Sequence, residues 1–124
     1  IICVGETEQQ RSNGEALATV LKQLEECVPE GADSKNIVIA YEPVWAIGTG
    51  KVATTADIDE IHTAIRQKLK EMLADGANIR ILYGGSVKPD NAGDILNIPD
   101  VNGALIGGAS LQAQSFLGIA EAAQ

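Results

Sequence analysis

The chain has 124 residues, a length typical of a single domain. Its 17 acidic and 9 basic side chains give a formal net charge of −8 at pH 7, so the basic face that nucleic-acid phosphates require is not expected. The hydrophobic fraction of 45% predicts a folded core, and no apolar run approaches the roughly 18 residues of a membrane span. Cys3 and Cys27 lie far apart in the sequence, which predicts free thiols in a reducing, cytoplasmic setting rather than a disulfide framework.

Two strands are predicted in the first part of the chain. Residues 1–4 form a short apolar run that is typical of a buried strand entered in mid-protein, and not of a signal peptide. Apolar residues then recur at helical spacing over 17–28, and Pro29 and Gly31 end the pattern. The second predicted strand, 37–41, ends before Pro43, because proline cannot donate a hydrogen bond to a neighbouring strand.

A longer amphipathic helix is predicted after a glycine-containing loop. Thr54 is expected to be its N-cap, with Asp57 three residues later in a capping-box position. The apolar stripe of this helix consists of Ile58, Ile61, Ile65, Leu69, Met72 and Leu73. Gly76 is predicted to end the helix in a left-handed conformation.

The second part of the chain predicts two more strands, at 79–83 and 103–106, each of which ends at a pair of glycines. A short helix is expected over 89–96 and an alanine-rich helix over about 112–123. Strands that alternate with helices predict an α/β fold with a parallel sheet. Two architectures fit this order, a doubly wound open sheet and a (β/α)8 barrel, of which four units would be half. No linker or internal repeat divides residues 1–124, which are expected to belong to one domain.

Glu42 comes directly after the second predicted strand, where the functional loops of α/β sheets lie. The following loop, 43–51, is apolar but contains two glycines, a composition typical of a lid that closes over a ligand and excludes water. A carboxylate under such a lid is desolvated on closure and becomes a stronger base. The alternative is a surface glutamate beside a hydrophobic loop that packs on a partner.

Glycine pairs follow the third and fourth predicted strands, as Gly84-Gly85-Ser86 and as Gly107-Gly108. Glycine lets backbone N–H groups approach an anion closely, and a following helix adds the positive end of its dipole. Two such loops match the phosphate site often built after the last two strands of a (β/α)8 barrel. Either pair could instead mark a tight turn.

Three other polar side chains carry weaker signals. Glu6, after the first strand, is interpreted as a polar loop residue or the partner of a site residue in preference to a catalytic group. His62, the only histidine, lies on the amphipathic helix and is expected to be structural. Cys3 lies inside a predicted strand and is expected to be an inert, small hydrophobic residue. The sequence contains no metal-ligating cluster, nucleophile elbow or P-loop.

Four segments resemble signatures of the triosephosphate isomerase family and follow the family's order. They are residues 3–7, 41–51, 83–87 and 107–111. The run Tyr41-Glu42-Pro43-Val44-Trp45-Ala46-Ile47-Gly48-Thr49-Gly50-Lys51 resembles the family's catalytic-base strand and flexible lid, and it is long and highly specific. The resemblance implies a (β/α)8 barrel of which this chain supplies the C-terminal half, strand–helix units five to eight.

The resemblance also implies a role for each matching residue. Glu42 would be the base that moves a proton between two adjacent carbons of a triose phosphate. Tyr83 would latch the closed lid, Glu6 would be a partner of Trp45, and Cys3 would pack under the base. The phosphate would be held by Gly48, Ser86, Gly107 and Gly108. The lid and its hinges would comprise Pro43, Val44, Trp45, Ala46, Ile47, Thr49, Gly50, Lys51, Val52 and Ala53, with the first hinge at 43–45 and the second hinge at 51–53.

The family's electrophilic lysine and histidine have no match in this chain, and His62 and Arg66 match helix positions instead. The chain alone is therefore expected to be nearly inactive, because oxyanion donors are worth orders of magnitude in rate. The implied partners are the N-terminal half of the barrel and a second subunit of a homodimer, and no cofactor or metal is implied. Two further hypotheses are a phosphate-binding half-barrel without turnover and a folding fragment without a ligand.

Overall fold

The structure is a computed structural model that describes residues 1–123. Its centre is a parallel sheet of three strands in the order β1 (Ile2–Val4), β2 (Ile39–Tyr41) and β3 (Ile81–Tyr83). Cys3 pairs with Ala40 and Ala40 with Leu82, so these three residues form one row across the sheet. These three predicted strands are confirmed, and each is shorter than predicted.

The helices of residues 1–123 follow the predicted pattern with one addition. They are α1 (Glu8–Ser12), α2 (Ala16–Cys27), α3 (Thr55–Met72), α4 (Pro89–Leu96) and α5 (Ala113–Glu121), with 3-10 turns η1 (Val44–Ala46), η2 (Gly76–Asn78) and η3 (Gly108–Leu111). The predicted capping box of Thr54 and Asp57 at the start of α3 is confirmed. Apolar spacing does not predict α1, because none of its side chains is buried.

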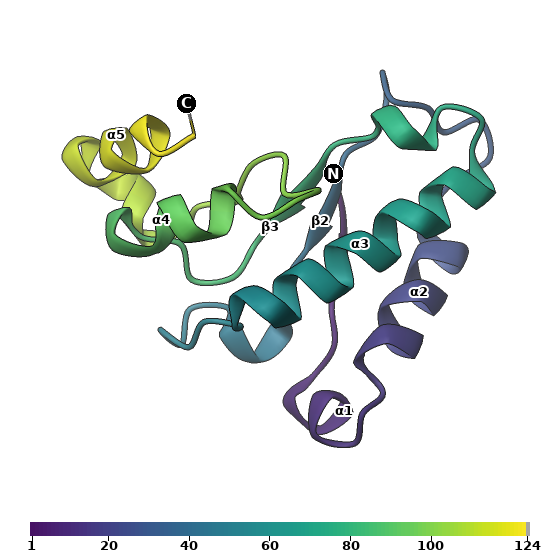
Figure 1. Cartoon of the computed structure of the whole chain (residues 1–124), viewed down its shortest axis with the longest axis horizontal. Helices are drawn as coiled ribbons and strands as arrows, with labels where there is room; N and C mark the ends of the chain where they lie inside the picture. Colours follow the sequence, from purple (N-terminus) through teal and green to yellow (C-terminus); the bar gives the residue numbers. More distant parts are fainter. Residues whose placement is uncertain (124) are drawn as a thin grey trace.

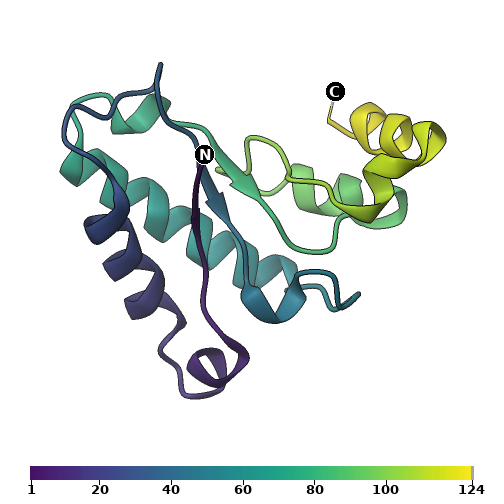
Figure 2. The same ribbon diagram turned by 180° about the vertical axis from the view of Figure 1, so that it is seen from behind.

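Helices α2 and α3 lie side by side on one face of the sheet (Figure 1). From behind, the strands lie in front of these two helices (Figure 2). Tyr41 and Tyr83, on the helix side, are buried in the core with the apolar stripe of α3, whereas Cys3, on the opposite side, is exposed. Helices on one side of a parallel sheet are typical of a barrel with an outer ring of helices, whereas a doubly wound sheet carries helices on both faces.

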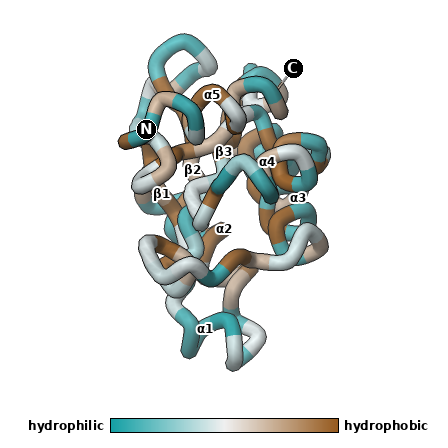
Figure 3. The backbone as a smooth tube through the Cα atoms, turned by 90° about the vertical axis from the view of Figure 1, so that its left-hand side faces the viewer, coloured by the Kyte–Doolittle hydropathy of each residue, from teal (hydrophilic) through white to brown (hydrophobic). Residues whose placement is uncertain are grey.

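Hydropathy follows this layering. The strongly hydrophobic segments gather at β2 and β3 and on the helices beside them, whereas α1 is largely hydrophilic (Figure 3). Within residues 1–123, no helix combines the length and the hydrophobicity that crossing a membrane requires.

Two sequence predictions are wrong. The expected strand over 103–106 is only a single bridge between Tyr83 and Ala104, because glycines bound this short segment and it pairs with β3 alone. Gly76 does not end α3 in a left-handed conformation, since the helix already ends at Met72 and Gly76 begins η2. A Cβ at Gly76 would collide with the Leu69 carbonyl oxygen, so the glycine serves a close approach of two backbones.

Candidate active site

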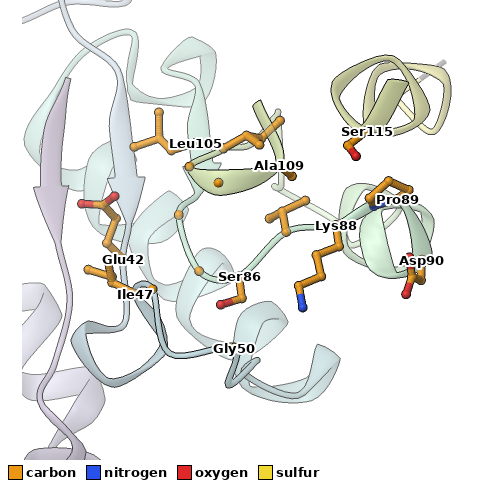
Figure 4. Close-up of a pocket in the computed structure, with 17 residues that line it drawn as sticks. Glu42, Ile47, Gly50, Ser86, Lys88, Pro89, Asp90, Leu105, Ala109 and Ser115 are labelled. Carbon is orange, nitrogen blue, oxygen red and sulfur yellow. The ribbon is translucent and has the colours of Figure 1, made fainter. Parts of the chain in front are cut away.

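A cavity of about 890 Å³ lies at the carboxyl ends of the strands (Figure 4). Its walls come from the ends of β2 and β3, the loop after β2, the start of α4 and the segment before α5. Every residue to which the sequence assigns a base or phosphate role lines it, namely Glu42, Gly48, Ser86, Gly107 and Gly108. The structure thus brings together residues that are as many as 66 positions apart along the chain.

Glu42 directly follows β2 and occupies a slot between two glycines of the neighbouring strands. A Cβ at Gly5 would collide with the Glu42 carbonyl oxygen, and a Cβ at Gly84 would collide with the Glu42 Cγ. The half-buried carboxylate extends along this slot at the edge of the cavity (Figure 4). Only residues without a side chain leave room for the glutamate in this position.

The environment of Cys3 is more open than that of a small hydrophobic residue packed in a core. The residue is exposed, because its neighbours Ile2 and Val4 pack against the core and successive side chains of a strand point to opposite faces. Partial burial of the thiol raises the pKa of Cys3, and the hydrogen bond to the neighbouring Glu42 carboxylate and its charge raise it further. The thiol and the carboxylate are therefore neighbours, although Cys3 itself does not line the cavity.

We refer to residues 43–53 as the lid segment. It begins with the single turn η1, and Gly48 and Gly50 adopt left-handed conformations, with φ of 66° and 79°. The turn is held internally, because the Thr49 hydroxyl donates to the Trp45 carbonyl over 2.9 Å. The apolar side chains of Val44, Ile47 and Val52 are exposed, whereas Ala46 and Ala53 are buried, so burial accounts for only part of the hydrophobic composition of the segment.

Two contacts join the lid segment to the end of β3 and to the loop that follows it. The Ser86 hydroxyl donates to the Ala46 carbonyl over 2.9 Å. The Tyr83 hydroxyl, buried at the end of β3, accepts from the Ala53 amide over 3.4 Å. Burial is the main reason that the pKa of Tyr83 lies above its ordinary value. The lid segment therefore contacts the loop after β3 through Ala46 and the end of β3 through Ala53.

The Glu6 side chain is completely buried beneath the first hinge. Its Oε1 accepts three hydrogen bonds, from Arg11 Nε over 2.7 Å, Trp45 Nε1 over 3.0 Å and the Tyr41 hydroxyl over 3.1 Å. Burial and the Glu6 charge together hold the pKa of Tyr41 well above its ordinary value. Glu6 is thus a partner of Trp45 rather than a group that faces the cavity.

Arg11, which carries no signal in the sequence, supplies the positive charge beside Glu6. Burial alone would lower the pKa of Arg11, but the hydrogen bonds to Glu6 and Tyr41 outweigh it, so the pKa lies above its ordinary value. The remaining guanidinium nitrogen, Nη1, donates to Asp57 Oδ1 over 2.9 Å. The capping box that joins Thr7 to Gln10 at the start of α1 is the local sequence signal that could have located this helix.

The backbone around the two glycine loops is suited to an anion. Within residues 1–123, the amide groups of Gly48, Gly107 and Gly108 donate to no backbone or side-chain acceptor. The turn η3 begins at Gly108, and its Ser110 hydroxyl donates back to the Gly107 carbonyl over 2.6 Å. Three unoccupied N–H groups on the wall of one cavity could donate to the oxygens of a phosphate.

His62 and Arg66 lie outside the cavity, on the buried side of α3. The His62 Nδ1 is 3.0 Å from the Asp100 carbonyl oxygen, and burial lowers the pKa of this imidazole. Arg66 donates to the Asp100 carboxylate over 2.8 Å and to three further acceptors, the Gly76 and Ile79 carbonyls and Asn102 Oδ1. The expectation that His62 is structural agrees with this placement.

The part of the chain that the structure describes holds no group of three or more His, Cys, Asp or Glu side chains that could bind a metal ion. The cavity instead offers the carboxylates of Glu42 and Asp90, the ammonium group of Lys88, backbone N–H groups and the hydroxyls of Ser86 and Ser115. Such a site can exchange a proton with a bound molecule and hold its anionic group.

Comparisons with known proteins identify relatives over nearly the whole chain. Residues 1–123 match the profile of the family described as triosephosphate isomerase. The triosephosphate isomerase of Xanthobacter flavus is 58% identical over 123 residues, which are 98% of this chain and 49% of the relative, and that of Afipia carboxidovorans is 57% identical over the same shares. The crystal structure of triosephosphate isomerase from Bartonella henselae superposes with a TM-score of 0.90 at 51% identity and covers 98% of this chain and 49% of that one. The chain spans about half the length of the curated relatives it matches.

Proposed function

Because this chain belongs to the triosephosphate isomerase family, we propose that it supplies the base, the lid and the phosphate-binding loops of an aldose–ketose isomerase that interconverts dihydroxyacetone phosphate and D-glyceraldehyde 3-phosphate. The observation that carries the proposal is the position of Glu42, Gly48, Ser86, Gly107 and Gly108 around one cavity. The setting that the family implies is glycolysis and gluconeogenesis in the cytoplasm.

In the proposed reaction, Glu42 removes a proton from the carbon next to the substrate carbonyl, and an enediolate forms. The protonated Glu42 then returns the proton to the adjacent carbon, and the hydroxyl proton passes from one oxygen of the enediolate to the other, which together convert the ketose into the aldose. The lid segment closes over the enediolate and keeps water away from it, which prevents loss of the phosphate. The reaction moves a proton between two carbons, and so it needs no metal or redox cofactor.

The phosphate of the substrate is proposed to bind the free N–H groups of Gly48, Gly107 and Gly108 and the Ser86 hydroxyl. Local backbone dipoles can bind an anion although the chain as a whole carries a net charge of −8. Binding by Gly48 requires the lid segment to move toward the other two glycines, and this movement would couple phosphate binding to closure.

We further propose that the four strand–helix units are the last four of a barrel, the C-terminal half. Support comes from the two glycine loops, since barrels often place their phosphate site after strands seven and eight. The remaining units would supply the electrophilic lysine and histidine that this chain lacks, and the intact enzyme would be a homodimer, as the family resemblance implies. Without those donors the chain alone would turn over substrate very slowly.

The test is an isomerase assay on the chain alone and on the chain joined to the half of the Bartonella henselae enzyme that it does not match. We expect background activity from the chain alone and clear activity from the joined protein. The Glu42→Gln variant of the joined protein should lose activity by about 10²–10⁴-fold or more. The exposed Lys22→Met variant, on α2, is the control. A folded joined protein without activity, or a fully active Glu42→Gln variant, would contradict the proposal.

A second candidate, a phosphate-binding half-barrel without turnover, is favoured by the unoccupied N–H groups of the chain as it stands. Titration with inorganic phosphate, followed by NMR of the Gly107 and Gly108 amides, distinguishes the two. Phosphate-dependent shifts together with a folded but inactive joined protein would favour this second function.

A further inference from the structure

The short helix α1 contacts both ends of the lid segment. At the first hinge, Trp45 donates to Glu6, and Glu6 is held by Arg11 of α1. At the second hinge, Lys51 forms an ion pair with Glu8 of α1 over 2.8 Å. A helix of five residues, remote from the cavity lining, therefore touches the segment at its start and near its end.

Arg11 forms the more buried of these connections. Its side chain is 22% exposed, compared with 55% for Lys51, so solvent screens the interactions of Arg11 less. Its guanidinium carbon also lies 6.0 Å from the centroid of the Trp45 ring, within the range of a cation–π interaction. Arg11 thus contacts the first hinge both through Glu6 and directly.

The same guanidinium extends the network to the residue that follows the second hinge. Asp57 accepts from Arg11 through Oδ1, and through Oδ2 it accepts from the amide and hydroxyl of Thr54. Thr54 is the N-cap of α3 and comes directly after Ala53. A continuous chain of hydrogen bonds therefore runs from Trp45 through Glu6, Arg11 and Asp57 to Thr54.

We propose that Arg11 is a positioning residue for the lid, because it connects the start of the lid segment, through Glu6, and the end, through Asp57, to one point on α1. This inference rests on the proposed function only in assigning residues 43–53 the role of a lid. Arg11 does not touch the substrate cavity. It sets the separation of the two ends between which the segment moves.

Charge explains why an arginine suits this place. Glu6 is completely buried and presents a carboxylate to Trp45, so a cation must compensate it. A planar guanidinium can donate to Glu6, Tyr41 and Asp57 at the same time, and each nitrogen here has one of these acceptors. A lysine would keep the charge but reach fewer of the three groups.

The test uses the chain itself, since Trp45 is its only tryptophan and its fluorescence reports on the first hinge. We would measure acrylamide quenching of Trp45 and amide hydrogen exchange over residues 43–57 in Arg11→Met and Arg11→Lys. The exposed Lys22→Met is the matched control, and far-UV circular dichroism checks the fold.

In Arg11→Met the quenching constant of Trp45 should rise by about twofold or more, and exchange at Thr54 and Asp57 should become faster, while the circular dichroism stays unchanged. Arg11→Lys should restore part of the loss at Trp45 and little at Asp57. Lys22→Met should match the parent chain. A folded Arg11→Met variant with the quenching and exchange of Lys22→Met would overturn the proposal.

If Arg11→Met does not fold, the comparison moves to a background without the buried charge. Glu6→Gln/Arg11→Met is then compared with Glu6→Gln, which retains an acceptor for Trp45. Faster exchange at Thr54 and Asp57 in the double variant supports the proposal, and equal exchange overturns it. None of these measurements needs substrate, so a result that overturns the role of Arg11 leaves the isomerase assignment intact. Conversely, an inactive joined protein would leave the role of Arg11 intact.

Discussion

Replacing Arg66 should remove a large share of the stability of this chain. The residue is 5% exposed, and its side chain makes four hydrogen bonds, which join α3 to the turn η2, to Ile79 just before β3 and to the segment 100–102. Arg66→Met keeps an unbranched apolar stem but removes the charge and every donor. The three separate segments would then lose their common partner.

The magnitude follows from the burial of the two partners. Loss of one member of a buried ion pair costs about 3–5 kcal/mol of free energy of unfolding. The Asp100 side chain is 31% exposed and can rehydrate, so we expect a loss near the lower end of that range, about 3 kcal/mol. Because domains are stable by only about 5–15 kcal/mol, this loss would weaken the fold without abolishing it.

Urea unfolding, followed by far-UV circular dichroism, measures the effect. With a slope of about 1.5 kcal/mol per molar urea, the midpoint should fall by about 2 M. Arg66→Lys should recover only part of the loss, because an ammonium cannot reach four acceptors that the guanidinium spans. The exposed Arg80→Met is the control, for which a change within about 0.5 kcal/mol is expected. Equal midpoints for Arg66→Met and Arg80→Met would refute this reasoning.

Three further predictions concern other residues. Gly76→Ala should lower the free energy of unfolding in urea by about 3 kcal/mol or more, because its Cβ would collide with the Leu69 carbonyl oxygen. Gly93→Ala is the control and should not destabilise the chain to this extent, because a Cβ at Gly93 meets nothing within 4 Å. Burial depresses the pKa of His62, so on acidification the imidazole is protonated in the unfolded chain before it is protonated in the folded chain, and the free energy of unfolding should fall as the pH drops below about 6.5. The His62→Asn variant should lose this part of the pH dependence, and an identical pH profile for the variant and the parent chain would contradict the prediction. Glu42→Gln should lower the pKa of Cys3, although burial should still hold this pKa above its ordinary value. The pH dependence of thiol alkylation in a Cys27→Ser background measures the pKa, and an unchanged value would show that the carboxylate does not act on the thiol.

Local sequence signals predict the helices and much of the cavity, because these features depend on residues that are close together along the chain. The spacing of apolar residues and the Thr54 capping box locate α3, and the residue after each strand locates Glu42 and Ser86. Strand ends can be read without knowing the packing, because parallel strands place all their carboxyl ends at one edge of the sheet. These walls of the cavity could therefore be anticipated from three short segments, 41–51, 83–87 and 107–111.

The residues that sequence reasoning missed act over long distances along the chain. Arg11 and Asp57 are 46 positions apart, and Arg66 and Asn102 are 36 apart, and no local pattern pairs them. The strand predicted over 103–106 fails for a related reason, since a strand requires a partner on the sheet and this segment pairs only at one residue. Long-range pairing and the number of neighbouring strands are properties of the fold, which a linear pattern does not contain.

The slot that holds Glu42 has a consequence for how this chain tolerates genetic change. Gly5 and Gly84 perform no chemistry, yet a Cβ at either position would strike Glu42. Every single-base change that alters a glycine codon either introduces a residue with a Cβ or ends translation. No missense step from these two codons is therefore conservative, and in a saturation mutagenesis screen Gly5 and Gly84 should tolerate as few substitutions as the glutamate between them.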